Sequence, residues 1–141
     1  MSAEHGNVFE RCFANQAGDL NGVTEAAIQF LEERGVDPQA LYKANLALEE
    51  LATNLLKYGY DDVAAHEIRL RLELAPGMLM LVLEDDGHEF NPVLSPEPNL
   101  DQPVQKRLPG GLGLHLVRKL VDQMSYERRD GRNRLTVKIR C

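Results

Sequence analysis

The stretch that decides the fold is EIRLRLELAPGMLMLVLEDDG, Glu67 to Gly87. Its first half alternates between charged residues and four apolar ones, Ile68, Leu70, Leu72 and Leu74, which is typical of a strand with one solvated face. The second half, Met78 to Leu83, is apolar on both faces and predicts a central strand. The Ala-Pro-Gly sequence between them predicts a turn, so the two strands should form an antiparallel hairpin.

Two amphipathic helices are predicted before this hairpin. Asp19 to Arg34 carries apolar residues at helical spacing, and Gly35 is a stop signal. Asp37 is a good N-cap with a proline at the first helical position, and the second helix should run from there to about Tyr58, before Gly59. A short strand is expected from Asn7 to Ala14.

The chain after the hairpin predicts a loop, a third helix and a second hairpin. Five prolines between Asn91 and Gly110 exclude a regular element and predict a lid at about residues 91–109. Gly111 to Met124 has a helical apolar register, and two strands, 125–130 and 134–140, flank a Gly-Arg-Asn turn. The order predicts an α/β two-layer sandwich, with a largely antiparallel sheet and three helices on one face.

Composition limits the function classes. A chain of 141 residues with net charge -6 and pI near 5.2 indicates one domain, residues 1–141, and argues against a nucleic-acid surface. The longest apolar run is too short to span a membrane. Cys12 and Cys141 make neither a disulfide framework nor a metal-ligand spacing, so a reducing cytoplasm is expected. The four histidines show no zinc-ligand spacing.

Glu50, Asn54 and Lys57 form a polar face on the predicted second helix. A carboxylate and a carboxamide four residues apart could act as a general base and as an oxygen ligand for a magnesium ion that holds a polyphosphate. On this helix alone, an ordinary solvated polar face explains the pattern better.

Asp85 and Gly87 follow the predicted central strand directly. A carboxylate fixed there can accept a hydrogen bond from a ligand amino group, and a glycine two residues later lets a flat ring approach the backbone. An ordinary acidic turn fits the same residues. A phosphorylated His88 is disfavoured, because Pro92 comes one residue too early and the segment is a turn.

Glycines at 110, 111 and 113 open the predicted third helix. Free backbone N–H groups at a helix N-terminus bind anions, and the helix dipole adds to the attraction. No Gly-Lys-Ser/Thr follows, so this is not a P-loop. Taken alone, the segment fits a flexible hinge as well as a phosphate cradle.

Together, in this order and spacing, the three segments resemble the nucleotide-binding motifs of the GHKL ATPase superfamily, in particular of anti-sigma factor serine kinases. LALEELATNLLKYGY is similar to that family's N box, VLEDDGHEFNP to its first glycine box, and GGLGLHLVRKLVDQM to its second. The resemblance covers the chain from about Val8 to the end. It implies the Bergerat-type ATP-binding fold, with a mixed, mostly antiparallel sheet.

The resemblance also implies a role for each matching residue. Glu50 would activate a substrate serine hydroxyl, and Asn54 would bind magnesium. Asp85 would take the adenine amino group, with Gly87 against the base. The phosphates would be held by the backbone of Gly110, Gly111, Leu112 and Gly113.

Three basic residues complete the expected nucleotide site, and two positions depart from the family pattern. Lys57 continues the polar face of the second helix, and Lys106 or Arg107, at the end of the lid, could reach the terminal phosphate. Glu89 stands where the family has a second glycine, and Tyr58 replaces a histidine often found after the N box.

The function implied is that of a cytosolic ATP- and Mg²⁺-dependent serine kinase that phosphorylates an anti-sigma factor antagonist, with a sigma factor as a possible second partner. A homodimer is also implied. The alternative is an ATP-dependent binding switch without phosphoryl transfer, and the intact Glu50 favours the enzyme. The catalytic domain of a two-component system is disfavoured, because no dimerising helix pair and no acceptor histidine are present in the sequence.

Overall fold

A computed structural model of the chain describes residues 2–94 and 111–141. In these residues, strands and helices occur in the order β1 (Ser2–His5), β2 (Val8–Ala14), α1 (Ala17–Glu33), α2 (Pro38–Tyr58), β3 (Glu67–Ala75), β4 (Met78–Asp85), α3 (Gly111–Leu120), β5 (Gln123–Arg129) and β6 (Arg132–Arg140). A short 3-10 turn, η1 (Pro92–Leu94), follows β4.

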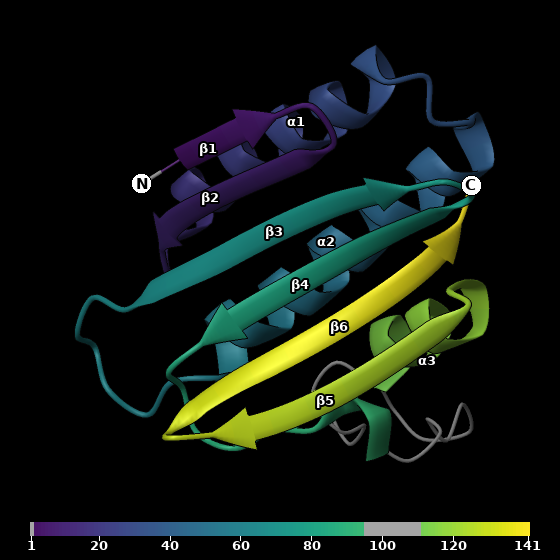
Figure 1. Cartoon of the computed structure of the whole chain (residues 1–141). Helices are drawn as coiled ribbons and strands as arrows, with labels where there is room; N and C mark the ends of the chain where they lie inside the picture. Colours follow the sequence, from purple (N-terminus) through teal and green to yellow (C-terminus); the bar gives the residue numbers. More distant parts are fainter. Residues whose placement is uncertain (1, 95–110) are drawn as a thin grey trace.

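The six described strands form one sheet in the order β1-β2-β3-β4-β6-β5, and α1, α2 and α3 all lie behind it in the view of Figure 1. This is the predicted two-layer sandwich. Every strand pair is antiparallel, so the described sheet is not mixed as the family resemblance implied. Neighbouring strands are antiparallel because hairpins and helix-containing connections return the chain in the opposite direction.

The hairpin of β3 and β4 forms as its sequence predicts. Ala75 pairs with Met78 across the turn, where Gly77 has a φ of +76°, a conformation that glycine adopts without strain. The apolar residues of the alternating strand β3 face the helices and are buried, namely Ile68, Leu70 and Leu72, whereas Glu67 and Arg69 are exposed or face the open side. β4 lies between β3 and β6, as expected of a strand that is apolar on both faces.

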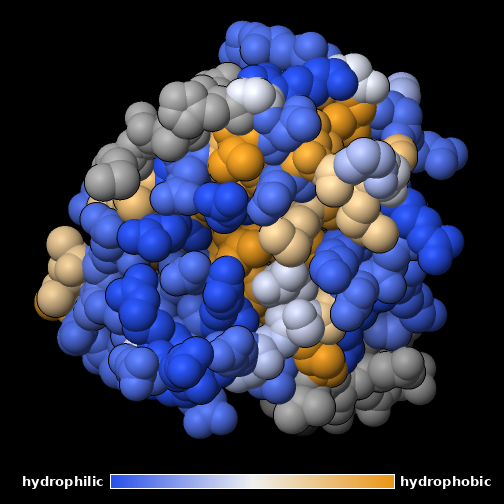
Figure 2. Space-filling model, viewed as in Figure 1, coloured by the Kyte–Doolittle hydropathy of each residue, from blue (hydrophilic) through white to orange (hydrophobic). Residues whose placement is uncertain are grey.

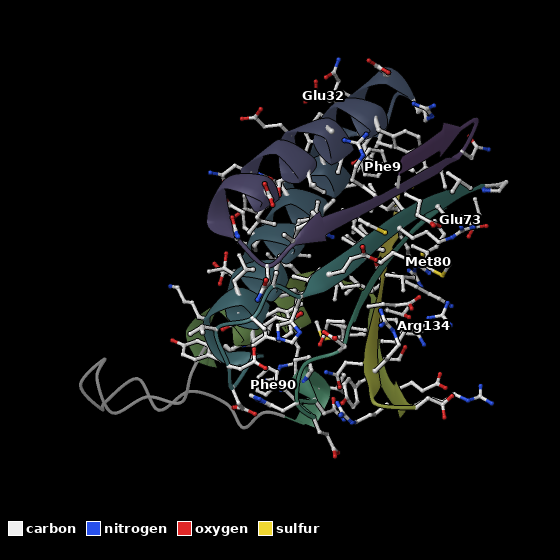
Figure 3. The ribbon with its side chains drawn as sticks, turned by 90° about the vertical axis from the view of Figure 1, so that its left-hand side faces the viewer. Phe9, Glu32, Glu73, Met80, Phe90 and Arg134 are labelled. Atoms are coloured by element: carbon white, nitrogen blue, oxygen red, sulfur yellow. The ribbon has the colours of Figure 1, made fainter. Side chains whose placement is uncertain are left out.

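Helix α2 packs closely on the sheet because its buried side is rich in small residues. Asp37 caps the helix by accepting a hydrogen bond from Ala40 N at 3.1 Å, as predicted. Small or apolar side chains then face the sheet at Ala40, Ala44, Ala47, Leu48, Leu51 and Ala52. Beside it, α1 contributes Phe30, whose ring lies 5.5 Å from that of Phe9 on β2; Figure 3 shows Phe9 between strand and helix.

Three sequence predictions need correction. The N-terminal strand β1 has no alternating pattern and was not predicted. The third helix ends at Leu120 rather than at Met124, because Met124 belongs to β5 and pairs with Val137. The last turn is formed by Asp130 and Gly131, both with positive φ, so that Asn133 lies inside β6 and not in the turn.

The open face of the sheet, seen in Figure 2, is mainly hydrophilic with apolar patches between the charged groups. Glu73, Met80 and Arg134 project from this face, away from the helices (Figure 3). No helix in residues 2–94 and 111–141 is both long and apolar enough to cross a membrane.

Candidate functional site

A pocket opens between α2, α3 and the ends of β4, β5 and β6, on the helix side of the sheet. The cavity at its centre has a volume of about 40 Å³. Its walls are mostly apolar, formed by Leu51, Leu55, Leu83, Phe90, Pro92, Leu114, Tyr126 and Leu135. Its polar groups are Asn54, Asp85, His88 and Asn133. Apolar walls with a few fixed polar groups suit a flat heterocyclic ligand.

Asp85 supplies the carboxylate of this pocket and is 6% exposed. Its Oδ1 accepts hydrogen bonds from Gly87 N at 2.8 Å and from Asn133 Nδ2 at 2.9 Å. Burial raises the pKa of the Asp85 carboxyl above its usual range, and these two hydrogen bonds oppose the rise. The side chain is therefore an oriented acceptor in an apolar pocket, and its contact with a ligand amino group stays a prediction.

Asn133 is the site residue that the sequence analysis missed. It is 4% exposed and connects β6 to the turn after β4 by donating to Asp85 and, at 2.9 Å, to His88 O. Its Oδ1 accepts from Tyr126 OH and, at 2.9 Å, from Arg128 Nη1. A polar residue in the inward register of Leu135, Val137 and Ile139 was the available signal, but assigning Asn133 to the turn concealed it.

Asn54 is buried in the pocket wall rather than solvated. Its Nδ2 donates to Glu50 O at 2.8 Å, one turn earlier in α2, and the side chain is 7% exposed. This bond fixes the orientation of the amide, and no hydrogen bond from the described residues reaches its oxygen, so the oxygen is available to a ligand. A carboxamide oxygen is a suitable Mg²⁺ ligand, so this residue fits the ion that the family resemblance implied.

Glu50 reaches from α2 to the beginning of α3. A Cβ placed on Gly113 would lie 1.9 Å from Glu50 Oε2 and 2.6 Å from its Cδ, so any larger residue here would displace this carboxylate. Glu50 thus lies against the N-terminal turn of α3, where unpaired backbone N–H groups attract anions. Two of the three predicted segments, the polar helix face and the glycine segment, meet here.

Gly87 has a structural reason to be glycine. A Cβ on this residue would lie 2.2 Å from Gly59 O, a backbone atom at the end of α2. The neighbouring His88 N donates to the same carbonyl at 3.0 Å. Close backbone packing between two turns therefore requires this glycine, and the contact with a base that the sequence analysis expected stays a prediction.

The remaining predicted residues lie elsewhere. Lys57 is exposed in the last turn of α2 and does not line the pocket, and Glu89 is also exposed. Gly111 and Leu112 begin α3. Lys106, Arg107 and Gly110, with most of the predicted lid, fall outside the described residues.

The chain is similar to known proteins in sequence and in fold. Residues 13–139 match the family described as Histidine kinase-like ATPase domain. The chain is 29% identical over 96 residues to the serine/threonine-protein kinase BtrW of Bordetella bronchiseptica, which covers 68% of each chain. The crystal structure of the RsbU and RsbW domains of Rv1364c from Mycobacterium tuberculosis superposes with a TM-score of 0.68 at 18% identity, over 96% of this chain. The chain spans about a third of that structure, 32% of its length. The match over residues 13–139 shows that the chain belongs to the histidine kinase-like ATPase domain family.

Proposed function

We propose that the protein is an ATP-dependent kinase that transfers a phosphoryl group to a serine of an anti-sigma factor antagonist. The observation that carries the proposal is the placement of Glu50 and Asn54 on consecutive turns of α2. Asn54 lines the pocket whose polar end is Asp85, and the Glu50 carboxylate lies at the N-terminus of α3. One helix thus joins a base-binding pocket to an anion-binding helix end.

The adenine ring would occupy the apolar pocket with its 6-amino group at Asp85. The ionised carboxylate can accept a hydrogen bond from an amino group, whereas a 6-oxo group would bring a second acceptor against it. Leu51, Leu83 and Leu135 provide apolar surface for the ring. Burial of the carboxylate strengthens the discrimination, because an unpaired buried acceptor is costly.

The phosphates would extend from this pocket to the first turn of α3. Backbone N–H groups there are free of intrahelical partners and are oriented by the helix dipole. Asn54 Oδ1 would contribute one ligand to a Mg²⁺ ion, which would neutralise phosphate charge during transfer. The family resemblance adds Lys106 or Arg107 as a contact to the terminal phosphate.

Glu50 would act on the incoming hydroxyl as a general base. The serine Oγ–H proton passes to the Glu50 carboxylate while the bond from Oγ to the γ-phosphorus forms. The bond from that phosphorus to the bridging oxygen breaks, and ADP leaves with the electron pair. A glutamate held beside Gly113 is suited to this role because it borders the helix end that binds phosphate.

The partner class comes from relatives rather than from the pocket. The relative from Bordetella bronchiseptica is named a serine/threonine-protein kinase. The resemblance to anti-sigma factor kinases supplies the antagonist as substrate. A sigma factor as second partner and a homodimer are further predictions from the same resemblance.

The test is a phosphorylation assay with Mg²⁺, radiolabelled ATP and a candidate antagonist encoded by a neighbouring gene. The proposal predicts a phosphoserine on the antagonist, lost by at least about 100-fold in Glu50→Gln while ATP affinity stays within about threefold. If wild type binds ATP and modifies no antagonist, the protein is instead a nucleotide-dependent binding switch. Equal transfer by Glu50→Gln would remove Glu50 from the mechanism.

A further inference from the structure

Asn133 is a buried amide whose hydrogen-bonding groups are all engaged at one end of the sheet. Its oxygen accepts from Tyr126 and Arg128, and its nitrogen donates to Asp85 Oδ1 and His88 O. A flipped amide would point its NH₂ group at two donors and its oxygen at two acceptors. The surrounding groups therefore allow one orientation, with the nitrogen facing Asp85.

We propose that Asn133 is a positioning residue for nucleotide recognition, which holds Asp85 Oδ1 so that Oδ2 is the acceptor for a 6-aminopurine. This inference rests on the proposed function, in which the pocket binds an adenine nucleotide. Oδ1 already accepts from Gly87 N and from Asn133 Nδ2. No hydrogen bond to Oδ2 occurs from the described part of the chain, so Oδ2 is the oxygen left for a ligand.

Asn133 also opposes the rise in the pKa of the Asp85 carboxyl. Burial has the largest influence on the pKa of Asp85 and raises it. The hydrogen bond from Asn133 is the strongest of the effects that lower this pKa. Without that donor the carboxyl would take up a proton at higher pH and lose the acceptor that an amino group needs. The other titratable or charged groups near Asp85 are Tyr60, Asp86, His88, Arg128 and Arg132.

A purely structural role would have different consequences. The hydrogen bonds from Asn133 to His88 O and from Arg128 to Gly87 O tie the β5-β6 hairpin to the turn after β4. Loss of these hydrogen bonds would lower the stability of the fold, and it would weaken the binding of every nucleotide at every pH. If Asn133 instead acts through Asp85, its replacement changes how the affinity for a nucleotide depends on pH and on the amino group of the purine.

Asn133→Asp tests the proposal because it keeps the shape of the side chain. Its oxygens can still accept from Tyr126 and Arg128, but the donor to Asp85 is replaced by a second carboxylate. At neutral pH two adjacent charges should weaken ATP binding by about 10- to 100-fold. At lower pH the introduced carboxyl takes a proton and can donate to Asp85, so affinity should rise and then fall again on further acidification.

Wild type should lose ATP affinity steadily as pH falls, so a bell-shaped profile belongs to the variant alone. The assay is calorimetric titration with ATP between about pH 4.5 and 8.5, with unfolding by urea measured in parallel. The exposed Asn21→Asp on α1 carries the same chemical change away from the pocket and should retain the wild-type profile. A variant with wild-type affinity, or with equal weakening at every pH, would overturn the proposal.

Tyr126→Phe covers the case in which Asn133→Asp fails to fold. It removes one donor to Asn133 Oδ1 and should move the midpoint of the wild-type pH profile upward. An NMR titration of the Asp85 carboxyl carbon without nucleotide should show the same upward shift of its pKa. An unchanged Asp85 titration would refute the positioning role, whereas wild type that binds no adenine nucleotide would refute the proposed function.

Discussion

Replacement of Gly113 by alanine tests how Glu50 is positioned. A Cβ there would lie 1.9 Å from Glu50 Oε2, whereas Cβ atoms in proteins stay at least 3.0 Å from other heavy atoms. The carboxylate must therefore move by about 1 Å. A misplacement of about 1 Å of a reacting group can cost about 100-fold in rate. We expect phosphoryl transfer to fall by about that factor.

Stability should not fall in the same way. The nearest atoms to the added methyl group all belong to the Glu50 side chain, which can rotate, and no backbone atom is closer. Gly113 lies within α3, where alanine is favoured over glycine by up to about 1 kcal/mol. The free energy of unfolding should therefore remain within about 1 kcal/mol of the wild-type value.

The assay combines single-turnover phosphorylation of the antagonist, ATP titration and urea unfolding. Gly22→Ala is the matched control, because Gly22 lies within α1 and an added Cβ meets no atom within 4 Å. It should leave transfer unchanged and raise stability by up to about 1 kcal/mol. Wild-type transfer by Gly113→Ala, or a loss matched by Gly22→Ala, would refute the reasoning.

Three further predictions concern stability, and urea unfolding checks each of them. Gly87→Ala sets a methyl group against the backbone carbonyl of Gly59 and should cost about 3 kcal/mol, at the upper end for overpacking; a cost below about 0.5 kcal/mol would contradict the close packing. Asp37→Ala removes the cap of α2 and should lower the free energy of unfolding by about 1 kcal/mol. Asp37→Asn can still cap the helix and should retain most of this stability. The hydrogen bond that the His66 ring donates to the Asp62 carboxylate raises the pKa of His66. This pair therefore stabilises the fold below the ordinary histidine pKa of about 6.5, and it ceases to do so as pH rises through the raised pKa. The stability advantage of wild type over His66→Gln should therefore shrink as pH rises above about 6.5, and a constant difference would contradict the pairing.

The sequence predicts the fold well where one pattern leaves a single solution. β3 alternates between apolar and charged residues, and β4 is apolar on both faces. Only a hairpin at the centre of a sheet buries the apolar residues of both strands. Asp37 and the following proline define the start of α2, and the structure confirms both. β1 was missed because it has no periodicity of its own and exists through pairing with β2.

The site could be predicted in part for a similar reason. Asp85 follows a recognisable strand, so its place at the end of β4 could be read from the sequence. Asn133 depends on the register of β6, which the two-residue turn of Asp130 and Gly131 determines. The predicted turn was shifted by two residues, which placed Asn133 outside the strand. No local sequence pattern then indicated its hydrogen bond with Asp85.

The contact of Glu50 with Gly113 could not be predicted from local sequence patterns either. The two residues belong to different helices, and their distance follows from how α2 and α3 pack on the sheet. The sequence could indicate only that a carboxylate and a glycine segment suited phosphate chemistry. Tertiary packing supplies the juxtaposition.

The central claim is that Asp85 reads the amino group of an adenine nucleotide, and comparison of ATP with ITP tests it most directly. The two nucleotides share ribose and phosphates and differ at the 6-position of the purine. Calorimetric titration of wild type should show ATP binding at least about 10-fold tighter than ITP, and Asp85→Asn should weaken ATP and narrow that difference. Equal affinity for ATP and ITP in wild type, or an unchanged preference in Asp85→Asn, would contradict the account.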